Sequence, residues 1–281
     1  MEYDFGRYLA AKETVEDRAL NGYVREALAR ALPPGPVDVL EVGVGGGAMM
    51  ARLAGREVRR GRYTAVDADP ANTAAIGRRF ADVSLPVKLE LITTDVYAFA
   101  DQARGRRQWD VLVAHAFLDL VNASRLLPHL FTLLRPGGHF YFPVNFDGLT
   151  ALQPTIDPVF DDEVIAAYHR TMDERGHEGR STGGSRAGRE LLTQIPAAGG
   201  EITAAGASDW VVWPRHGAYP ADEAYFLHYM LHFFESSLTG RPELDAARLR
   251  AWLARRRAQI DAGELGLIVH QLDVFGRVPG P

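Results

Sequence analysis

The first half of the chain alternates between short apolar runs and longer stretches in which apolar residues recur at helical spacing. The short runs are rich in β-branched residues and end at acidic, glycine or proline positions, which is typical of strands buried on both faces. They lie at residues 37–42, 62–67, 87–92, 109–114 and 139–144. Helical patterns fall between them, at 48–57, 70–80 and 123–134. This alternation predicts an α/β fold with a doubly wound, mostly parallel sheet and helices on both faces.

The second half of the chain is less regular. Helical spacing occurs at 161–175, 185–198, 221–238 and 244–262, and strand-like residues lie at 201–202, 208–213 and 265–275. We therefore expect seven strands, the last of them antiparallel and either inserted in the sheet or at its edge. The stretch at 176–188 is rich in Gly, Ser and Arg and predicts a loop.

No linker separates a second independent domain, so the sequence predicts one domain over residues 1–281. Within it, residues 1–35 form an N-terminal helical cap and residues 36–146 a cofactor-binding core. Insertions at 147–184 and 219–263 are expected on the substrate side, as a cap or a dimer contact. The helix expected at 221–238 is apolar nearly all round, which makes a homodimer a reasonable expectation.

Polar residues follow four successive predicted strands. Glu41 precedes a glycine-rich turn after the first strand, and Asp67, Asp95 and His115 follow the next three. Open α/β sheets bind ligands at the edge where parallel strands end. Glycines without a Cβ let the turn approach a ligand closely. The sequence therefore predicts a nucleotide or nucleoside cofactor site at this edge.

These segments resemble the class I S-adenosylmethionine-dependent methyltransferases. The matching stretches are EVGVGGG (41–47), AVDADP (65–70), TTDVYAF (93–99), WDVLVAHAF (109–117) and LLRPGGHFYF (133–142). The resemblance covers about residues 37–145. It implies S-adenosylmethionine as the cofactor and S-adenosylhomocysteine as the product.

The resemblance also implies roles for the glycine turn. Gly43, Gly45 and Gly47 would let the loop lie against the methionine portion of the cofactor. Glu41 would anchor the turn or a bridging water.

Further roles follow for the loops after the next three strands. Asp67, with Ala68 beside it in the acidic loop, would accept both ribose hydroxyls, because a carboxylate has two acceptor oxygens. Asp95 would accept the adenine amino group, and Val96 would pack on the ring. His115 would line the opening near the sulfonium.

Composition removes several alternatives. The chain has no cysteine, which excludes disulfides, thiolate metal sites and cysteine nucleophiles. Its net charge of −5 does not favour a nucleic-acid partner. No apolar run approaches the roughly 18 residues that a membrane span needs, and we expect a cytoplasmic protein without membrane contact. Almost all of the basic residues are arginine, which we attribute to a GC-rich bacterial genome.

Other functions remain open at this point. The turn Gly43–Ala48 satisfies G-x-G-x-x-A, as in a nicotinamide dehydrogenase, although no Tyr-x-x-x-Lys pair accompanies it. A protein that binds S-adenosylmethionine without transferring methyl is also compatible, as is aminopropyl transfer. We expect no metal, because His115 lies where the catechol type of methyltransferase places an aspartate.

The acceptor is expected to be a small, partly apolar molecule enclosed by the segments outside the core. We place Tyr8, Tyr168, His169 and Arg186 at its binding site, the arginine as a bidentate partner for a carboxylate. His115 and His169 are the candidates for a catalytic base.

Overall fold

The computed structural model describes residues 2–177 and 180–280, with one large mixed sheet at the centre. In the described part this sheet has eight strands, in the order β3-β2-β1-β4-β5-β10-β8, with β9 pairing to β10. Their bounds are β1 Val37–Val42, β2 Gly61–Asp67, β3 Lys88–Thr93, β4 Trp109–Val113, β5 Leu134–Gln153, β8 Glu201–Ala207, β9 Trp210–Val212 and β10 Gly266–Arg277. The first five strands are parallel to one another, and β10 lies antiparallel between β5 and β8. A separate two-stranded sheet pairs β6 (Gly176–His177) with β7 (Arg180–Ser181).

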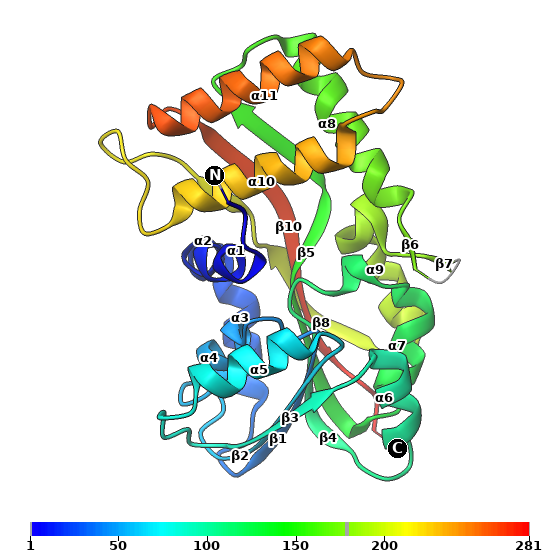
Figure 1. Cartoon of the computed structure of the whole chain (residues 1–281). Helices are drawn as coiled ribbons and strands as arrows, with labels where there is room; N and C mark the ends of the chain where they lie inside the picture. Colours follow the sequence, from blue (N-terminus) through cyan, green and yellow to red (C-terminus); the bar gives the residue numbers. More distant parts are fainter. Residues whose placement is uncertain (1, 178–179, 281) are drawn as a thin grey trace.

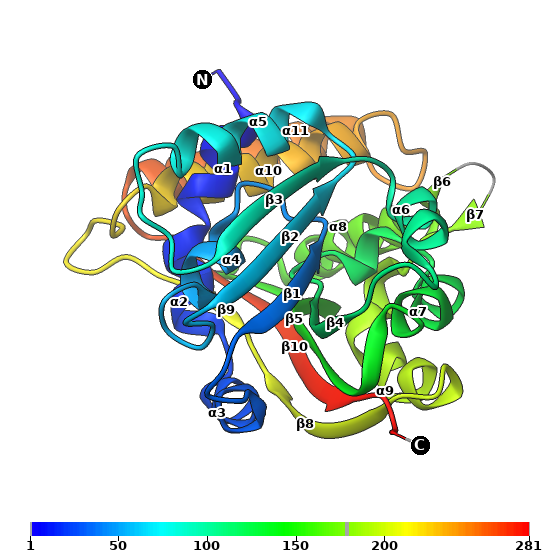
Figure 2. The same ribbon diagram turned by 90° about the horizontal axis from the view of Figure 1, so that it is seen from below.

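Helices cover both faces of the large sheet (Figures 1 and 2). Alternate strand residues enter two separate apolar clusters. Val39 belongs to the cluster on one face, and Leu40 to the cluster that α6, α7 and α9 cover. The helices are α1 Phe5–Ala11, α2 Glu13–Ala19, α3 Gly22–Ala31, α4 Ala48–Leu53, α5 Pro70–Arg79, α6 Val96–Ala103, α7 Ala123–Phe131, α8 Pro158–Asp173, α9 Ala187–Ala197, α10 Glu223–Leu238 and α11 Ala246–Asp261, with the short 3₁₀ turns η1 Leu118–Leu120 and η2 Gly184–Arg186. The doubly wound α/β fold expected from the sequence is confirmed. None of the helices described is both long and apolar enough for a membrane span.

The structure corrects the expected number and length of the strands. The sheet has eight strands because two strands, β8 and β9, both pair with β10. Strand β5 continues nine residues past Val144, where the sequence predicts an end. Val144 takes a left-handed backbone conformation (φ 61°), and its N–H donates to Asp273 Oδ1 at 2.8 Å. The buried Asp273 side chain thus provides a hydrogen-bond acceptor for this irregular stretch of backbone. Beyond it, β5 resumes its pairing with β10.

The extended β5–β10 pair positions one wall of the cavity described below. It carries both strands out of the core toward α8, α10 and α11, which close one side of the molecule (Figure 1). The N-terminal region reaches the same helices, because α1 packs on α10. The expected N-terminal helical cap consists of three helices, and Asn21 caps the last of them by accepting a hydrogen bond from Val24 N. These segments form the upper wall of the cavity described next.

Candidate functional site

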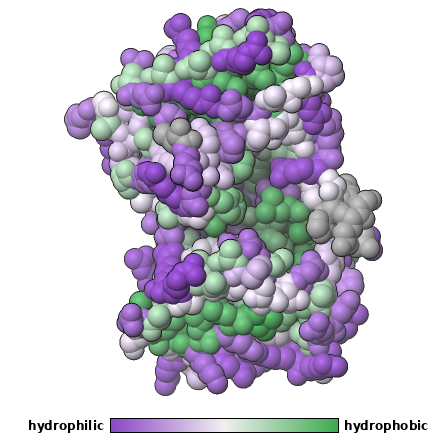
Figure 3. All heavy atoms as spheres, in the orientation of Figure 1, coloured by the Kyte–Doolittle hydropathy of each residue, from purple (hydrophilic) through white to green (hydrophobic). Residues whose placement is uncertain are grey.

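A single cavity of about 860 Å³ lies between the carboxyl ends of β1, β2 and β4 and the helices α1, α8 and α10. Figure 3 shows apolar side chains gathered in the hollow at the middle of this face. One half of the cavity is lined by the loops that follow the parallel strands. The other half is lined mainly by apolar and aromatic side chains, among them Phe5, Tyr8, Phe146, Tyr168, Met230 and Phe233. A volume of this size is typical of an enclosed small-molecule site.

The glycine turn after β1 lies at the edge of this cavity. Gly43 and Gly45 have φ values of 66° and 53°, a region that side chains with a Cβ rarely adopt. A Cβ at Gly43 would lie 2.1 Å from the ring of Phe117, so only glycine fits between the turn and that ring. Both residues line the cavity, whereas Gly47 does not. A Cβ there would approach Ile76 at 3.1 Å, so Gly47 serves the packing of α5.

Asp67 connects the glycine turn to the loop after β2. Its Oδ2 accepts from Gly45 N at 2.8 Å, and its Oδ1 accepts from Asp69 N at 2.9 Å and from Asn72 Nδ2 at 3.1 Å. Asp67 and Ala68 line the cavity. Because two carboxylate oxygens offer about four lone-pair directions, the side chain retains acceptor capacity for ligand hydroxyls.

Asp95 caps the N-terminus of α6, a structural role in addition to the ligand contact expected from the sequence. Its Oδ1 accepts from Tyr97 N at 2.8 Å and Ala98 N at 3.2 Å and so caps α6. The capping bonds use Oδ1, which leaves Oδ2 for a ligand. Asp95 and Val96 both line the cavity.

Glu41 lies beneath the turn and does not line the cavity. Its side chain is fully buried, and Oε2 accepts from Tyr63 Oη at 2.6 Å. Burial raises the pKa of Glu41 to about 8, although the Tyr63 hydrogen bond and Arg52 act in the opposite direction. The structure thus places Glu41 as a support for the turn.

This raised pKa predicts a pH-dependent stability effect. The folded protein holds a proton on Glu41 that the unfolded chain releases, so stability falls as pH rises from the ordinary value of 4.5 to about 8. Glu41→Gln cannot ionise and avoids this loss. We expect the variant to melt several degrees above the wild type at pH 8 and close to it at pH 5, in thermal unfolding followed by circular dichroism. Equal differences at both pH values would contradict this prediction.

A buried charge cluster lies beside His115. Glu16 on α2 is fully buried, and its carboxylate lies 3.1 Å from Lys12 Nζ, 3.2 Å from Arg52 Nη1 and 3.2 Å from His115 Nε2. Burial raises the pKa of Glu16, but the interactions with His115, Lys12 and Arg52 act more strongly together and hold this pKa well below its usual range. His115 lines the cavity, as the sequence predicts, but its Nε2 faces Glu16.

Only weak signals in the sequence point to this cluster. Lys12 and Glu16 are four residues apart on neighbouring helical turns, a spacing that also occurs on many exposed helices. Lys12 is one of only two lysines in the chain, and it lines the cavity. Nothing in the sequence marks Glu16 as buried.

Tyr8 and Tyr168 both line the cavity, as expected. The Tyr8 ring stacks on Tyr229 of α10 with centroids 4.5 Å apart, and the Tyr168 ring stacks on Phe234 at 4.1 Å. Burial raises the pKa of both phenols, so each is a neutral hydroxyl at physiological pH.

Two other predicted substrate contacts do not line the cavity. His169 lies behind its wall, where Nε2 is 3.1 Å from Thr150 Oγ1, and burial lowers its pKa. Arg186 is exposed at the start of α9. The neighbouring Arg189 pairs with Asp147 at 2.7 Å. The arginines at 186 and 189 therefore do not form the predicted clamp for a carboxylate.

Helix α10 is apolar nearly all round because other helices of the same chain pack against it. It packs against α1, α8 and α11, and Met230 and Phe233 line the cavity. Its buried faces are covered by the same chain, so they give no reason to expect a dimer.

Comparisons with known proteins agree with this arrangement. Residues 40–140 match the family model described as a methyltransferase domain. No curated protein matches the sequence significantly. A protein of Bacillus halodurans C-125, provisionally assigned as a methyltransferase, has a similar structure at 12% identity, with a TM-score of 0.56, over 92% of this chain and 100% of the other. The YcgJ protein of Bacillus subtilis is similar at 11% identity, with a TM-score of 0.53, over 92% of this chain and 98% of the other. At these identities the structures show a shared fold.

Proposed function

Because residues 40–140 of this chain form a class I S-adenosylmethionine-dependent methyltransferase domain, we propose that the protein methylates a small-molecule acceptor by direct displacement. The observation that carries the proposal is the single cavity, which joins the glycine turn and Asp67 to an aromatic chamber. One continuous cleft of about 860 Å³ suits a nucleoside cofactor together with a small acceptor.

The residues at the strand ends fit S-adenosylmethionine. Asp67 would hold the ribose hydroxyls, Gly43 and Gly45 the methionine portion, and Asp95 with Val96 the adenine. When bound, this cofactor supplies an electrophilic methyl group on sulfur.

The remaining work falls to the chain's own side chains. Aromatic residues from α1, α8 and α10 enclose the acceptor and exclude water. Holding the acceptor in line with the methyl group accounts for much of the rate enhancement in a direct displacement. His115 contributes a polar group to the cavity wall, and its Nε2 lies 3.2 Å from the buried Glu16 carboxylate behind it.

The proposal is tested by methyl transfer from methyl-labelled S-adenosylmethionine to a panel of small phenols, amines and carboxylic acids. We expect label in at least one small product, with S-adenosylhomocysteine released in equal amount. Transfer to nucleic acid or protein and to none of the small molecules would contradict the proposed acceptor class.

A further inference from the structure

We infer that Asp119 and Arg175 select the acceptor, and that the acceptor carries a hydroxyl or amino group at one end of an apolar body and an anionic group at the other. This inference rests on the proposed methyl transfer, because it assigns the acceptor half of the same cavity. Asp119 lies two residues beyond the matching stretch 109–117, and Arg175 lies outside the range of the resemblance.

The first observation is a difference among the charged residues that line the cavity. Most have a partner within the described chain. Lys12 pairs with Glu16, Glu13 with Arg79 and Arg241 with Glu174, while Asp67 and Asp95 accept backbone hydrogen bonds. Across residues 2–177 and 180–280, by contrast, Asp119 Oδ1 has no hydrogen-bond partner and the Arg175 guanidinium no ion pair.

Asp119 is held firmly in place. It lies on the 3₁₀ turn η1, which the hydrogen bond from Leu120 N to Phe117 O closes at 2.9 Å. The backbone of Gly183 packs directly on this turn. A Cβ at Gly183 would lie 2.6 Å from the Leu118 carbonyl oxygen and 2.9 Å from Asp119 Cα. This close approach fixes the carboxyl group at the cavity wall.

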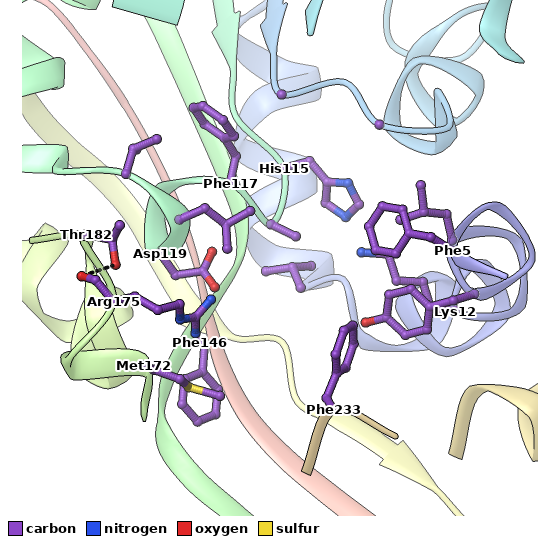
Figure 4. Close-up of a pocket in the computed structure, with 18 of the residues that line it drawn as sticks. Phe5, Lys12, His115, Phe117, Asp119, Phe146, Met172, Arg175, Thr182 and Phe233 are labelled. Carbon is purple, nitrogen blue, oxygen red and sulfur yellow. Dashed lines mark hydrogen bonds between the residues drawn. The ribbon is translucent and has the colours of Figure 1, made fainter. Parts of the chain in front are cut away.

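Arg175 also lines the cavity, just beyond the end of α8. Its backbone N–H donates to Met172 O at 3.2 Å, and its carbonyl oxygen accepts from Thr182 N at 3.2 Å. Figure 4 shows the Asp119 carboxylate and the Arg175 guanidinium directed toward one another at one side of the cavity. They form no ion pair, so each retains its capacity to bind a ligand group.

The surroundings of Asp119 suit a proton acceptor. Burial raises its pKa, and the cations Arg175 and Lys12 act in the opposite direction. The other titratable groups that face it are the neutral phenols of Tyr8 and Tyr168. A buried carboxylate oxygen without a partner is costly, and an O–H or N–H of the acceptor would satisfy it. The planar guanidinium of Arg175 in turn matches a carboxylate or phosphate.

With this arrangement, each bond and proton of the methyl transfer can be accounted for. The nucleophilic oxygen or nitrogen of the acceptor forms its bond to the methyl carbon, and the electrons of the broken carbon–sulfur bond stay on sulfur. The proton of the nucleophile passes to Asp119 Oδ1. Phe146 and Met172 line the cavity near the two charged groups, and Phe233 lines its other side (Figure 4). These three side chains would pack on the apolar body of the acceptor.

Three matched probes test the inference on protein saturated with S-adenosylhomocysteine. 4-Hydroxyphenylacetate carries both groups, phenylacetate only the carboxylate and 4-methylphenol only the hydroxyl. By calorimetric titration, we expect 4-hydroxyphenylacetate to bind at least tenfold more tightly than either half-probe. In Asp119→Asn, it should bind no more tightly than phenylacetate does. In Arg175→Gln, it should bind no more tightly than 4-methylphenol does.

Arg250→Gln, at an exposed arginine of α11 outside the cavity, serves as the control and should behave as the wild type. Equal affinity for the three probes, or no binding of any at millimolar concentration, would overturn the inference alone, provided that S-adenosylhomocysteine still binds. If Asp119 and Arg175 served only to pair with each other, both variants would lower the melting temperature equally and leave the probe preference unchanged, which would also overturn it. Failure of wild type to bind S-adenosylhomocysteine would instead overturn the proposed function.

Discussion

Replacing Asp67 with alanine is expected to weaken S-adenosylhomocysteine binding about 100-fold, or roughly 2.8 kcal/mol. Two losses combine in this variant. The carboxylate that would accept the ribose hydroxyls disappears, and hydrogen bonds to a charged group contribute about 1.5–3 kcal/mol. The Gly45 N–H also loses the acceptor that it has at 2.8 Å, so the glycine turn is less well held for the ligand. Calorimetric titration measures the change directly.

Asp69→Ala is the matched control for this prediction. Asp69 lies two residues away and caps α5 by accepting from Ala71 N at 2.8 Å, but it does not line the cavity. Loss of an N-cap costs about 1 kcal/mol of stability and should leave the affinity nearly unchanged. An Asp67→Ala variant that binds S-adenosylhomocysteine as tightly as Asp69→Ala does would show that Asp67 is not the ribose contact.

Replacing Glu16 with alanine is expected to have the largest effect on folding. The substitution leaves Lys12, Arg52 and His115 near one another without the carboxylate between them. Removing one partner of a buried charge pair typically costs about 3–5 kcal/mol. We expect a loss of this size at pH 7 in the free energy of unfolding, measured by urea denaturation. Glu13→Ala, which breaks a half-exposed pair with Arg79, should cost at most about 1 kcal/mol.

The effect of Glu16 should depend on pH in a defined direction. Its pKa is lower in the folded protein than the ordinary value of 4.5, so the stability that it contributes is fully present above that value. This contribution is lost as pH falls toward the folded-state pKa. The difference between wild type and Glu16→Ala should therefore shrink below pH 4.5. A difference that stays constant from pH 7 to pH 3 would exclude an ionised Glu16 as its source.

The loops at the ends of the parallel strands were predictable because their signals are local. Strand, glycine turn and acid follow one another within about ten residues, and parallel strands bring such turns to one edge. Val37–Val42 matches β1 residue for residue for this reason. The structure places Asp67, Asp95 and His115 around the cavity together, as the order of the strands predicts.

The other half of the cavity was not predictable in the same way, because it depends on contacts distant in sequence. The extension of β5 beyond Val144 requires Asp273, which lies 129 residues further along the chain. The position of Asp119 depends on close packing with Gly183, and Glu16 is buried by residues from α4 and the loop after β4. His169 was favoured as a base because of its residue type, but the fold turns it behind the cavity wall.

The central claim is that this cavity binds S-adenosylmethionine, and titration of the wild type with S-adenosylhomocysteine tests it most directly. The account predicts one site per chain with micromolar affinity and no comparable binding of reduced or oxidised nicotinamide dinucleotide. Tight binding of a nicotinamide dinucleotide by folded protein, without binding of S-adenosylhomocysteine, would contradict it.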